Sequence, residues 1–337
     1  MQESETIYDD NDENPINQHC NPRRRLCWRD GGLAPGSPDT SSQPHDHVDQ
    51  WGGTLLLFSI AYRMLGVVAD AEDILQEAYL RVQAHANEVV EKPKQYLTTI
   101  VTRLCLNQLS AARTKREEYL GPWLPEPILT AEQPELVNPV EKALLHDSLS
   151  LAFLVLLEAL QPAERAVFLL HEVFDYKHSE IAAMLDKSEA ACRQHLRRAK
   201  AYIAERRPRF TATAEHHEQL LHSFIHGVQS GDIDLFLQLL ADEVNLVADG
   251  GGERGAARNV LRGKTAVSGF ALGAYRNSPA GITYTMPLLN GQRAILAHRA
   301  DGRPYYAMFL YGKERQVQLI YVVAGRKLAA LAGQLGR

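Results

Sequence analysis

Cysteine is scarce in this sequence, with four among 337 residues: Cys20, Cys27, Cys105 and Cys192. Their spacings match neither a disulfide framework nor a zinc pattern, so we expect reduced thiols, no metal and no cofactor. Long hydrophobic runs are also missing, because no window approaches the roughly 18 uncharged apolar residues of a membrane-spanning helix. The first residues lack the basic start and apolar stretch of a secretory leader. We therefore expect a cytoplasmic protein that does not bind membranes.

Residues 1–45 lack apolar periodicity and are rich in Asp, Asn, Pro, Gly and Ser, which predicts a disordered tail. The whole chain has an ordinary globular balance, with 45% apolar and 23% charged residues. Its length suggests two or three domains. The formal net charge of −5 argues only weakly against nucleic acid, because a whole-chain sum hides local blocks of charge.

Residues 46–116 are predicted to form a helical domain, since apolar residues recur there at three- and four-residue steps. Asp70 stands where a helix N-cap is expected, and its charge suits the positive end of the helix dipole. The helix that follows has an acidic and polar face that consists of Asp70, Glu72, Asp73, Gln76 and Glu77. Such a face does not suit DNA.

Residues 92–116 have the opposite character, with six Lys or Arg and no acid. Positive charge suits phosphates, while aromatic and polar side chains can stack on unpaired bases or hydrogen-bond to them. The candidate contacts are Lys92, Lys94, Tyr96, Thr98, Thr99, Arg103, Asn107 and Arg113. Burial of Tyr96 in the core is the alternative.

Five prolines interrupt residues 117–139 and exclude a continuous helix or central strand, which predicts a linker. At about 3.1 Å per residue in an extended form, this segment could reach roughly 70 Å. It contains the sequence GPWLPEP at residues 121–127, where Trp123, flanked by prolines, is a natural anchor for a groove.

Residues 140–209 return to a helical pattern and contain a predicted helix-turn-helix, whose last helix has Ser188 as its N-cap. Between residues 187 and 209, eight Lys or Arg and two acids give a local net charge of +6. The candidate DNA contacts are Ser188, Glu189, Arg193, Gln194, Arg197, Arg198 and Lys200. Arg193 could fork onto guanine. A basic helix that merely faces solvent is the alternative.

Residues 210–337 change to alternating, β-rich segments, which predicts an antiparallel sheet with flanking helices. The clearest hairpin runs over residues 282–298 and turns at Asn290-Gly291. Asp301-Gly302 and Tyr311-Gly312 predict later turns between apolar runs.

The order of acidic helix, basic helix, linker and helix-turn-helix over residues 48–207 resembles the extracytoplasmic-function (ECF) sigma factors of bacterial RNA polymerase. The resemblance implies two all-α domains, sigma regions 2 and 4, and a role in promoter-specific transcription initiation. The acidic helix would dock on core RNA polymerase, whose β′ clamp and β flap are the implied partners. Residues 92–116 would melt and read the minus-ten element of promoter DNA, and the helix-turn-helix would read the minus-thirty-five element. These elements lie about 58 Å apart for roughly 17 base pairs, which the linker can span.

The third domain, residues 210–337, resembles a SnoaL-like domain of the cone-shaped, α+β NTF2-like fold, which one subgroup of these sigma factors carries fused. GPWLPEP and the DGGG sequence at residues 249–252 are similar to that subgroup's motifs, as are YRMLG and SEAACRQ. The resemblance implies a built-in modulator in place of a separate anti-sigma protein. The implied contacts are Trp123, Leu124, Pro125, Glu126, Pro127, Asp249, Gly250, Gly251 and Gly252.

The chain departs from this pattern in two places. Asp186 stands where a turn glycine is common, although Asp tolerates left-handed backbone geometry. The Lys327-Leu328 pair is present, but the Asn-Pro-Asp expected before it is not, which leaves the contacts of the C-terminal tail open.

Other functions remain as alternatives. A helix-turn-helix repressor would leave the acidic helix and the first basic block unexplained. The SnoaL-like domain could bind an unknown small-molecule ligand, or act as an isomerase or cyclase with Asp249 as its base. An Asp beside three glycines is expected to be solvated and thus a poor base, which favours a protein that is not an enzyme. His222 and His226 share a helix face without an evident third metal ligand.

Overall fold

The computed structural model describes residues 54–84, 92–116, 121–130, 148–206, 214–251, 257, 259–313 and 316–335. These residues belong to one unit, His45–Arg337. Outside the described residues lie the predicted tail at 1–45, with Cys20 and Cys27, the linker residues 117–120 and 131–139, and Gly252.

The first helical domain consists of α2 (Thr54–Leu65), α3 (Val68–Ala84) and α4 (Pro93–Arg116). Each helix buries the apolar face that its periodicity predicts, with Ile60, Ile74 and Val101 almost completely enclosed. Between α2 and α3, Gly66 adopts a φ of +70°, which glycine reaches without steric cost.

The second helical domain contains α6 (Leu151–Glu158), α7 (Pro162–Phe168), a short π-helix (Leu169–Val173), α8 (His178–Leu185) and α9 (Glu189–Arg206). The last two helices form the predicted helix-turn-helix. Asp186 ends α8 in the left-handed conformation, with φ +53° and ψ +53°, and so takes the place of a turn glycine. Ser188 Oγ accepts a hydrogen bond from the Ala191 N–H (3.1 Å), which confirms the N-cap prediction.

The C-terminal domain combines one main sheet with helices. Its helices are α10 (Ala214–Ser230), α11 (Ile233–Leu239), α12 (Lys264–Arg276), the 3₁₀ helix η2 (Gly325–Leu328) and α13 (Ala329–Leu335). The sheet has the strand order β2-β1-β8-β7-β6-β3. Its strands are β1 (Leu240–Asp249), β2 (Leu261–Arg262), β3 (Thr283–Thr285), β6 (Ile295–His298), β7 (Pro304–Lys313) and β8 (Gln316–Ala324). A separate two-stranded ribbon is formed by β4 (Leu288–Leu289) and β5 (Gln292–Arg293).

One strand pair differs from the predicted antiparallel sheet. Strand β1 runs parallel to β8, with Asp249 opposite Val323. The prediction was wrong here because the chain between these strands is long enough for a crossover, which parallel pairing requires. Since parallel strands end at the same edge, Asp249 lies beside the segment Gly325–Leu328 that follows β8.

The turn predictions were correct at two of three places. Asn290-Gly291 and Asp301-Gly302 form the turns of β4–β5 and β6–β7. Tyr311-Gly312 instead lies inside β7, at a shift in register with β8. A Cβ on Gly312 would come within 2.3 Å of the Gln316 carbonyl oxygen. This glycine permits close backbone approach, which a sequence pattern does not distinguish from a turn.

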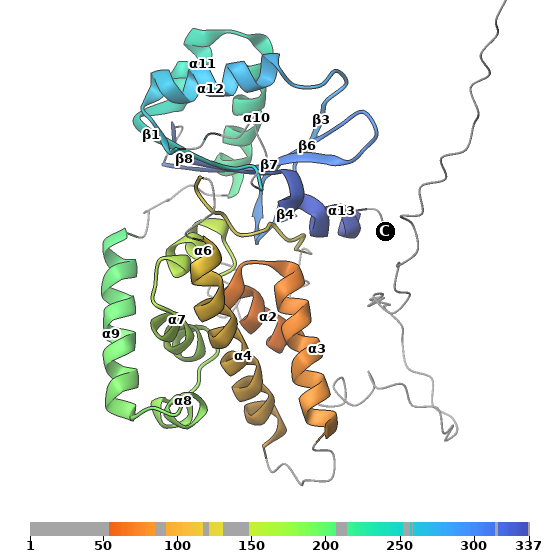
Figure 1. Cartoon of the computed structure of the whole chain (residues 1–337). Helices are drawn as coiled ribbons and strands as arrows, with labels where there is room; N and C mark the ends of the chain where they lie inside the picture. The colour runs from red at the N-terminus through yellow and green to blue at the C-terminus, as the bar shows by residue number, and fades with distance from the viewer. Residues whose placement is uncertain are drawn as a thin grey trace, which may run out of the picture. The chain divides into compact units, whose positions relative to one another are not determined.

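The two faces of the sheet contact different parts of the chain (Figure 1). Helices α10, α11 and α12 cover one face, where Phe224 and Phe236 belong to a buried cluster with β1 and β8. On the other face, Phe309 and Val323 share a cluster with Leu124 of the linker and Leu151 of α6. The α+β prediction is confirmed, and the C-terminal domain shares a core with the helical part of the chain.

Candidate functional site

The outer surface of α9 has the composition that the sequence predicts. Cys192, Leu196, Ala199 and Ile203 are buried against the rest of the domain. The opposite surface exposes all seven candidate DNA contacts: Ser188, Glu189, Arg193, Gln194, Arg197, Arg198 and Lys200. The arrangement presents cations and hydrogen-bond donors along one helix, as a helix that enters the major groove does.

Three of these cations already have acidic partners. Arg198 bonds to Glu164 (2.8 Å), Lys200 to Glu172 (2.8 Å), and Arg193 to Glu189 (3.1 Å). Because these pairs are at the surface, each contributes about 0–1 kcal/mol. Phosphates can therefore replace the carboxylates at little cost.

The candidate contacts at Lys92 and on α4 differ in exposure. Lys92, Lys94, Arg103 and Asn107 are exposed, whereas Tyr96 and Thr99 are half-buried. Thr98 is fully buried and its hydroxyl lies 2.9 Å from the hydroxyl of Tyr176, so in this conformation it cannot meet a nucleic acid. Arg113 belongs to α4, but its side chain lies outside the described residues.

The acidic face of α3 is exposed at Glu72, Asp73, Gln76 and Glu77, while Asp70 is half-buried. Leu80 extends this face, because positions 73, 76, 77 and 80 follow one another at helical spacing, and it is 59% exposed. The sequence reading missed this residue. An exposed leucine beside carboxylates is suited to a protein partner.

The N-cap prediction for Asp70 was wrong. Helix α3 begins at Val68, and the Val68 N–H donates to Glu126 Oε2 of the linker at 2.9 Å. An acidic side chain thus stabilises the helix start as expected, but it comes from 58 residues away. Burial raises the pKa of Glu126, and the hydrogen bond from Val68 and the charge of Lys327 oppose this shift.

The linker is held by Asp249 at the end of β1. The carboxylate is buried, with 2% of the residue exposed, and Oδ2 accepts a hydrogen bond from the Leu124 N–H at 2.7 Å. Lys327 Nζ lies 2.6 Å from Oδ2, donates to the Leu124 carbonyl oxygen, and lies 4.1 Å from the ring centre of Trp123. Oδ1 accepts from the Gly251 N–H at 2.9 Å. The expectation of a solvated Asp249 was wrong, because the ammonium and two amides replace water.

The indole of Trp123 packs on Gly66. A Cβ at Gly66 would lie 2.6 Å from Cη2 of Trp123, and the Glu126 N–H donates to the Gly66 carbonyl oxygen at 2.8 Å. The linker therefore contacts the first helical domain and the C-terminal domain at once, within four residues.

We expect Gly66→Ala to weaken this contact. The new methyl group would collide with Trp123, and the φ of +70° would cost about 1–2 kcal/mol for any non-glycine residue. We expect the linker to open more often, which hydrogen exchange of the peptide that covers residues 121–130 measures as a faster exchange rate. Gly231→Ala is the matched control, because Gly231 has a φ of +69° and no atom within 4 Å of the added Cβ. Equal effects of the two variants on the linker would contradict the contact.

A second contact is made by the β4–β5 turn. Asn290 is fully buried, and its side chain accepts from the Ile128 N–H (3.0 Å) and donates to Tyr62 Oη (2.7 Å) and the Leu149 carbonyl oxygen (3.1 Å). Tyr62 in turn donates to the Glu126 carbonyl oxygen at 2.6 Å. Leu129 forms an antiparallel bridge with Leu289, so the linker adds to the ribbon as a short strand.

Two family models match the helical domains: "Sigma-70 region 2" matches residues 55–115 and "Sigma-70, region 4" matches residues 150–203. The ECF RNA polymerase sigma factor SigJ of Mycobacterium tuberculosis is 34% identical over 239 residues, which cover 70% of this chain and 76% of SigJ. The chain belongs to the ECF sigma factors. The probable ECF sigma factor SigI of the same species is 31% identical over 243 residues, or 72% of this chain and 80% of SigI.

The crystal structure of SigJ extends the match beyond the two sigma regions. It aligns with a TM-score of 0.65 at 29% identity and covers 84% of this chain and 98% of SigJ. The fused α+β domain is therefore part of the shared architecture. As a sigma factor, the chain binds core RNA polymerase and promoter DNA to initiate transcription.

The two sigma regions of this sigma factor contact each other directly. Arg103 Nε of α4 donates to the Met184 carbonyl oxygen at the end of α8 (2.7 Å). Arg165 of α7 donates to the Met64 carbonyl oxygen (2.5 Å) and pairs with Glu158 (2.9 Å). Burial lowers the pKa of Arg165 to about 10, so the guanidinium stays charged near neutral pH. Buried residues of both regions form one continuous apolar cluster.

The described part of the chain shows neither a metal site nor a membrane-spanning helix. No group of three or more His, Cys, Asp or Glu there could hold a metal ion, and His222 and His226 are exposed on α10. None of the described helices is long and apolar enough to cross a membrane.

Proposed function

We propose that this sigma factor reads promoters through α9 at the minus-thirty-five element and α4 at the minus-ten element, and that it docks on core polymerase through the exposed face of α3. The domain boundaries are proposed as 46–116, 140–209 and 210–337, with the linker at 117–139. The C-terminal domain modulates initiation by holding the linker. The protein acts in the cytoplasm, where core polymerase and promoter DNA are found, and performs no covalent chemistry.

One observation carries the proposal of modulation: Arg103, a candidate minus-ten contact, is bonded to the helix-turn-helix at Met184. Promoter elements roughly 17 base pairs apart are separated by about 58 Å along B-DNA. Two regions that share a core and a direct hydrogen bond cannot meet both elements at that spacing. Initiation therefore requires α4 and α8 to separate. The contacts of the C-terminal domain with the linker oppose this separation.

Tethering makes modest contacts sufficient for this control. With an effective concentration near millimolar, an intramolecular affinity of about 10 μM would keep roughly 99% of the molecules closed. Weakening the contact by about 3 kcal/mol would raise the open fraction from about 1% to more than half.

The test is run-off transcription by core RNA polymerase from the region upstream of the protein's own gene, after that region has been shown to support initiation. The parent is compared with Trp123→Ala, which removes the ring between Gly66 and Lys327. Asp234→Asn is the control, because Asp234 is exposed on α11. We expect initiation to rise several-fold with Trp123→Ala and to stay unchanged with Asp234→Asn. Equal initiation by all three would exclude control through the linker.

The DNA-reading role of α9 has a separate test. We expect Arg197→Ala to weaken duplex binding and to reduce the slope of log affinity against log salt by about 1, because one phosphate contact is lost. The measurement is fluorescence anisotropy with a labelled promoter duplex between roughly 50 and 200 mM salt. Arg262→Ala in β2 removes the same charge far from α9 along the chain and should leave the slope unchanged.

The two rival functions are disfavoured by particular residues. A repressor would need only the helix-turn-helix, yet the acidic and apolar face of α3 with Leu80 also has the character of a protein-binding surface. An isomerase or cyclase would need Asp249 as a base, but this carboxylate is bonded to Lys327 and to two backbone amides. Binding to core polymerase distinguishes a sigma factor from both.

A further inference from the structure

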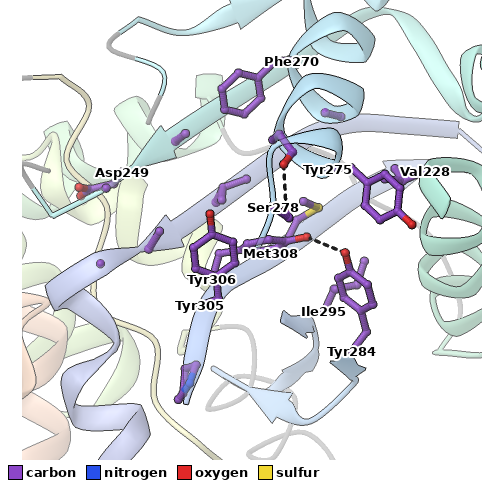
Figure 2. A pocket seen from close by; sticks show the side chains of 18 of the residues that line it. Val228, Asp249, Phe270, Tyr275, Ser278, Tyr284, Ile295, Tyr305, Tyr306 and Met308 are labelled. Carbon is purple, nitrogen blue, oxygen red and sulfur yellow. Dashed lines mark hydrogen bonds between the residues drawn. The ribbon is translucent and has the colours of Figure 1, made fainter. Parts of the chain in front are cut away.

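A cavity of about 620 Å³ lies in the C-terminal domain between the sheet and helices α10 and α12 (Figure 2). This volume is within the range of about 300–1,000 Å³ that is usual for small-molecule sites. Phe270, Met308 and Val322 line it and are only half-buried, although they belong to the interior of the domain. Apolar side chains that stay accessible inside a fold are suited to the apolar body of a ligand.

Two polar groups of the cavity lie close to each other. The hydroxyls of Tyr284 and Tyr306 are 3.4 Å apart (Figure 2). Burial raises the pKa of both tyrosines above the ordinary value of 10, so both hydroxyls remain protonated. Because Tyr306 donates its proton to Tyr284, the Tyr284 hydroxyl can donate to a ligand. The two hydroxyls supply a fixed point of recognition within an apolar wall.

The charge of the lining is positive. Arg299, Arg303 and Arg326 line the cavity, and Asp249 is the single acid among the described lining residues. Asp249 is already compensated by Lys327, and Arg303 is paired with Asp301 at 2.6 Å. Arg299 instead stacks on Tyr305, with its guanidinium carbon 4.7 Å from the ring centre. This stacking holds a cation at the apolar cavity.

We propose that the cavity binds a small molecule with an aromatic or alicyclic body and one anionic group, and that Arg299 binds the anion. The ring enters between Phe270 and Met308, and the Tyr284 hydroxyl donates to an oxygen of the ligand. A neutral ligand of the same shape loses the contact with the guanidinium.

The site is also connected to the linker. Asp249 and Gly250 form one wall of the cavity, while the Asp249 carboxylate accepts from the Leu124 N–H on the linker side. Arg326 lines the cavity next to Lys327, which donates to the Leu124 carbonyl oxygen. A ligand that moves the end of β1 therefore changes the hydrogen bonds that hold the linker.

The first test uses two fluorescent probes with nearly the same ring system and the full-length protein. These are 8-anilinonaphthalene-1-sulfonate, which is anionic, and N-phenyl-1-naphthylamine, which is neutral. We expect one binding site and an affinity at least about tenfold higher for the sulfonate, as hydrogen bonds to charged groups allow. Equal affinities of the two probes would overturn the anion preference.

Two matched pairs of variants locate the site. Arg299→Gln should weaken sulfonate binding by about tenfold and leave the neutral probe unaffected, whereas Arg276→Gln, exposed on α12 outside the cavity, should change neither. Ala274→Trp at the cavity should abolish binding of both probes, and Ala266→Trp on the same helix should not. Unchanged binding by Arg299→Gln and Ala274→Trp would overturn the site.

Hydrogen exchange tests the connection to the linker. With saturating sulfonate probe, the peptide that covers residues 121–130 should change its exchange rate by at least about threefold, since its Leu124 amide is bonded to a cavity residue. The Arg299→Gln variant at the same probe concentration should show a smaller change. An unchanged rate in the parent would overturn the connection, and it would not bear on transcription by the sigma factor itself.

Discussion

Replacing Asp249 with asparagine is expected to release the linker and to speed hydrogen exchange of the Leu124 amide by roughly 100-fold. The variant leaves the Lys327 ammonium buried without its counter-charge, since the exposed side-chain fractions of Lys327 and Asp249 are 9% and 1%. Breaking one side of a buried ion pair costs about 3–5 kcal/mol. Exchange of the peptide over residues 121–130, followed by mass spectrometry, measures the effect.

A variant of the ion-pair partner tests the role of charge. Lys327→Met should destabilise the closed linker as much as Asp249→Asn does. The double variant should recover about 1–3 kcal/mol of that loss, because neither charge then remains buried alone. If the double variant lost the sum of the two single effects, the ion pair would not be what holds the linker. The same variants should raise run-off transcription in the order of their exchange rates.

Replacing Asn290 with alanine is expected to lower the free energy of unfolding by about 2–4 kcal/mol and the Tm by on the order of 5 °C. The change removes three hydrogen bonds, to Ile128, Tyr62 and Leu149, from a fully buried side chain. It also places alanine at a φ of +49°. Thermal unfolding of the full chain, followed by circular dichroism, measures the loss.

Glycine at the same position isolates the backbone contribution. Asn290→Gly also lacks the hydrogen bonds, but it accepts a positive φ without strain, so it should be about 1 kcal/mol less harmful than alanine. Asn277→Ala at the end of α12 is the exposed control and should stay within about 0.5 kcal/mol of the parent. A loss for Asn290→Ala no larger than for this control would contradict the role of Asn290 between the domains.

The positions of the proposed DNA-reading helices could be predicted because their signals are local. Ser188 caps α9 and Asp186 ends α8, and both act on backbone groups within a few residues. The face of α9 that carries Arg197 follows from a period of 3.6 residues and from the burial of Leu196. The turn at Asn290-Gly291 is equally local, since its positive φ values restrict the choice of residue.

The long-range hydrogen bonds of the candidate site residues could not be predicted from the sequence. Asn290 forms a sequence-recognisable turn, yet its hydrogen bond to Tyr62 joins residues 228 positions apart. Glu126 replaces Asp70 as the acidic group at the start of α3, since the linker folds back onto that helix. Arg103 has the chemistry of a nucleic-acid contact, and its hydrogen bond to Met184 depends on how two domains meet.

The helices, the signs of their exposed faces and two of the three turns could be predicted from the sequence, because periodicity, capping and charge act over a few residues. The burial of Asp249, which the sequence predicted to be solvated, follows from tertiary contacts. That outcome depends on a parallel strand pair that brings Lys327 beside it and on a linker amide 125 positions away. No local pattern contains these partners, and without them a carboxylate beside glycines would stay in water.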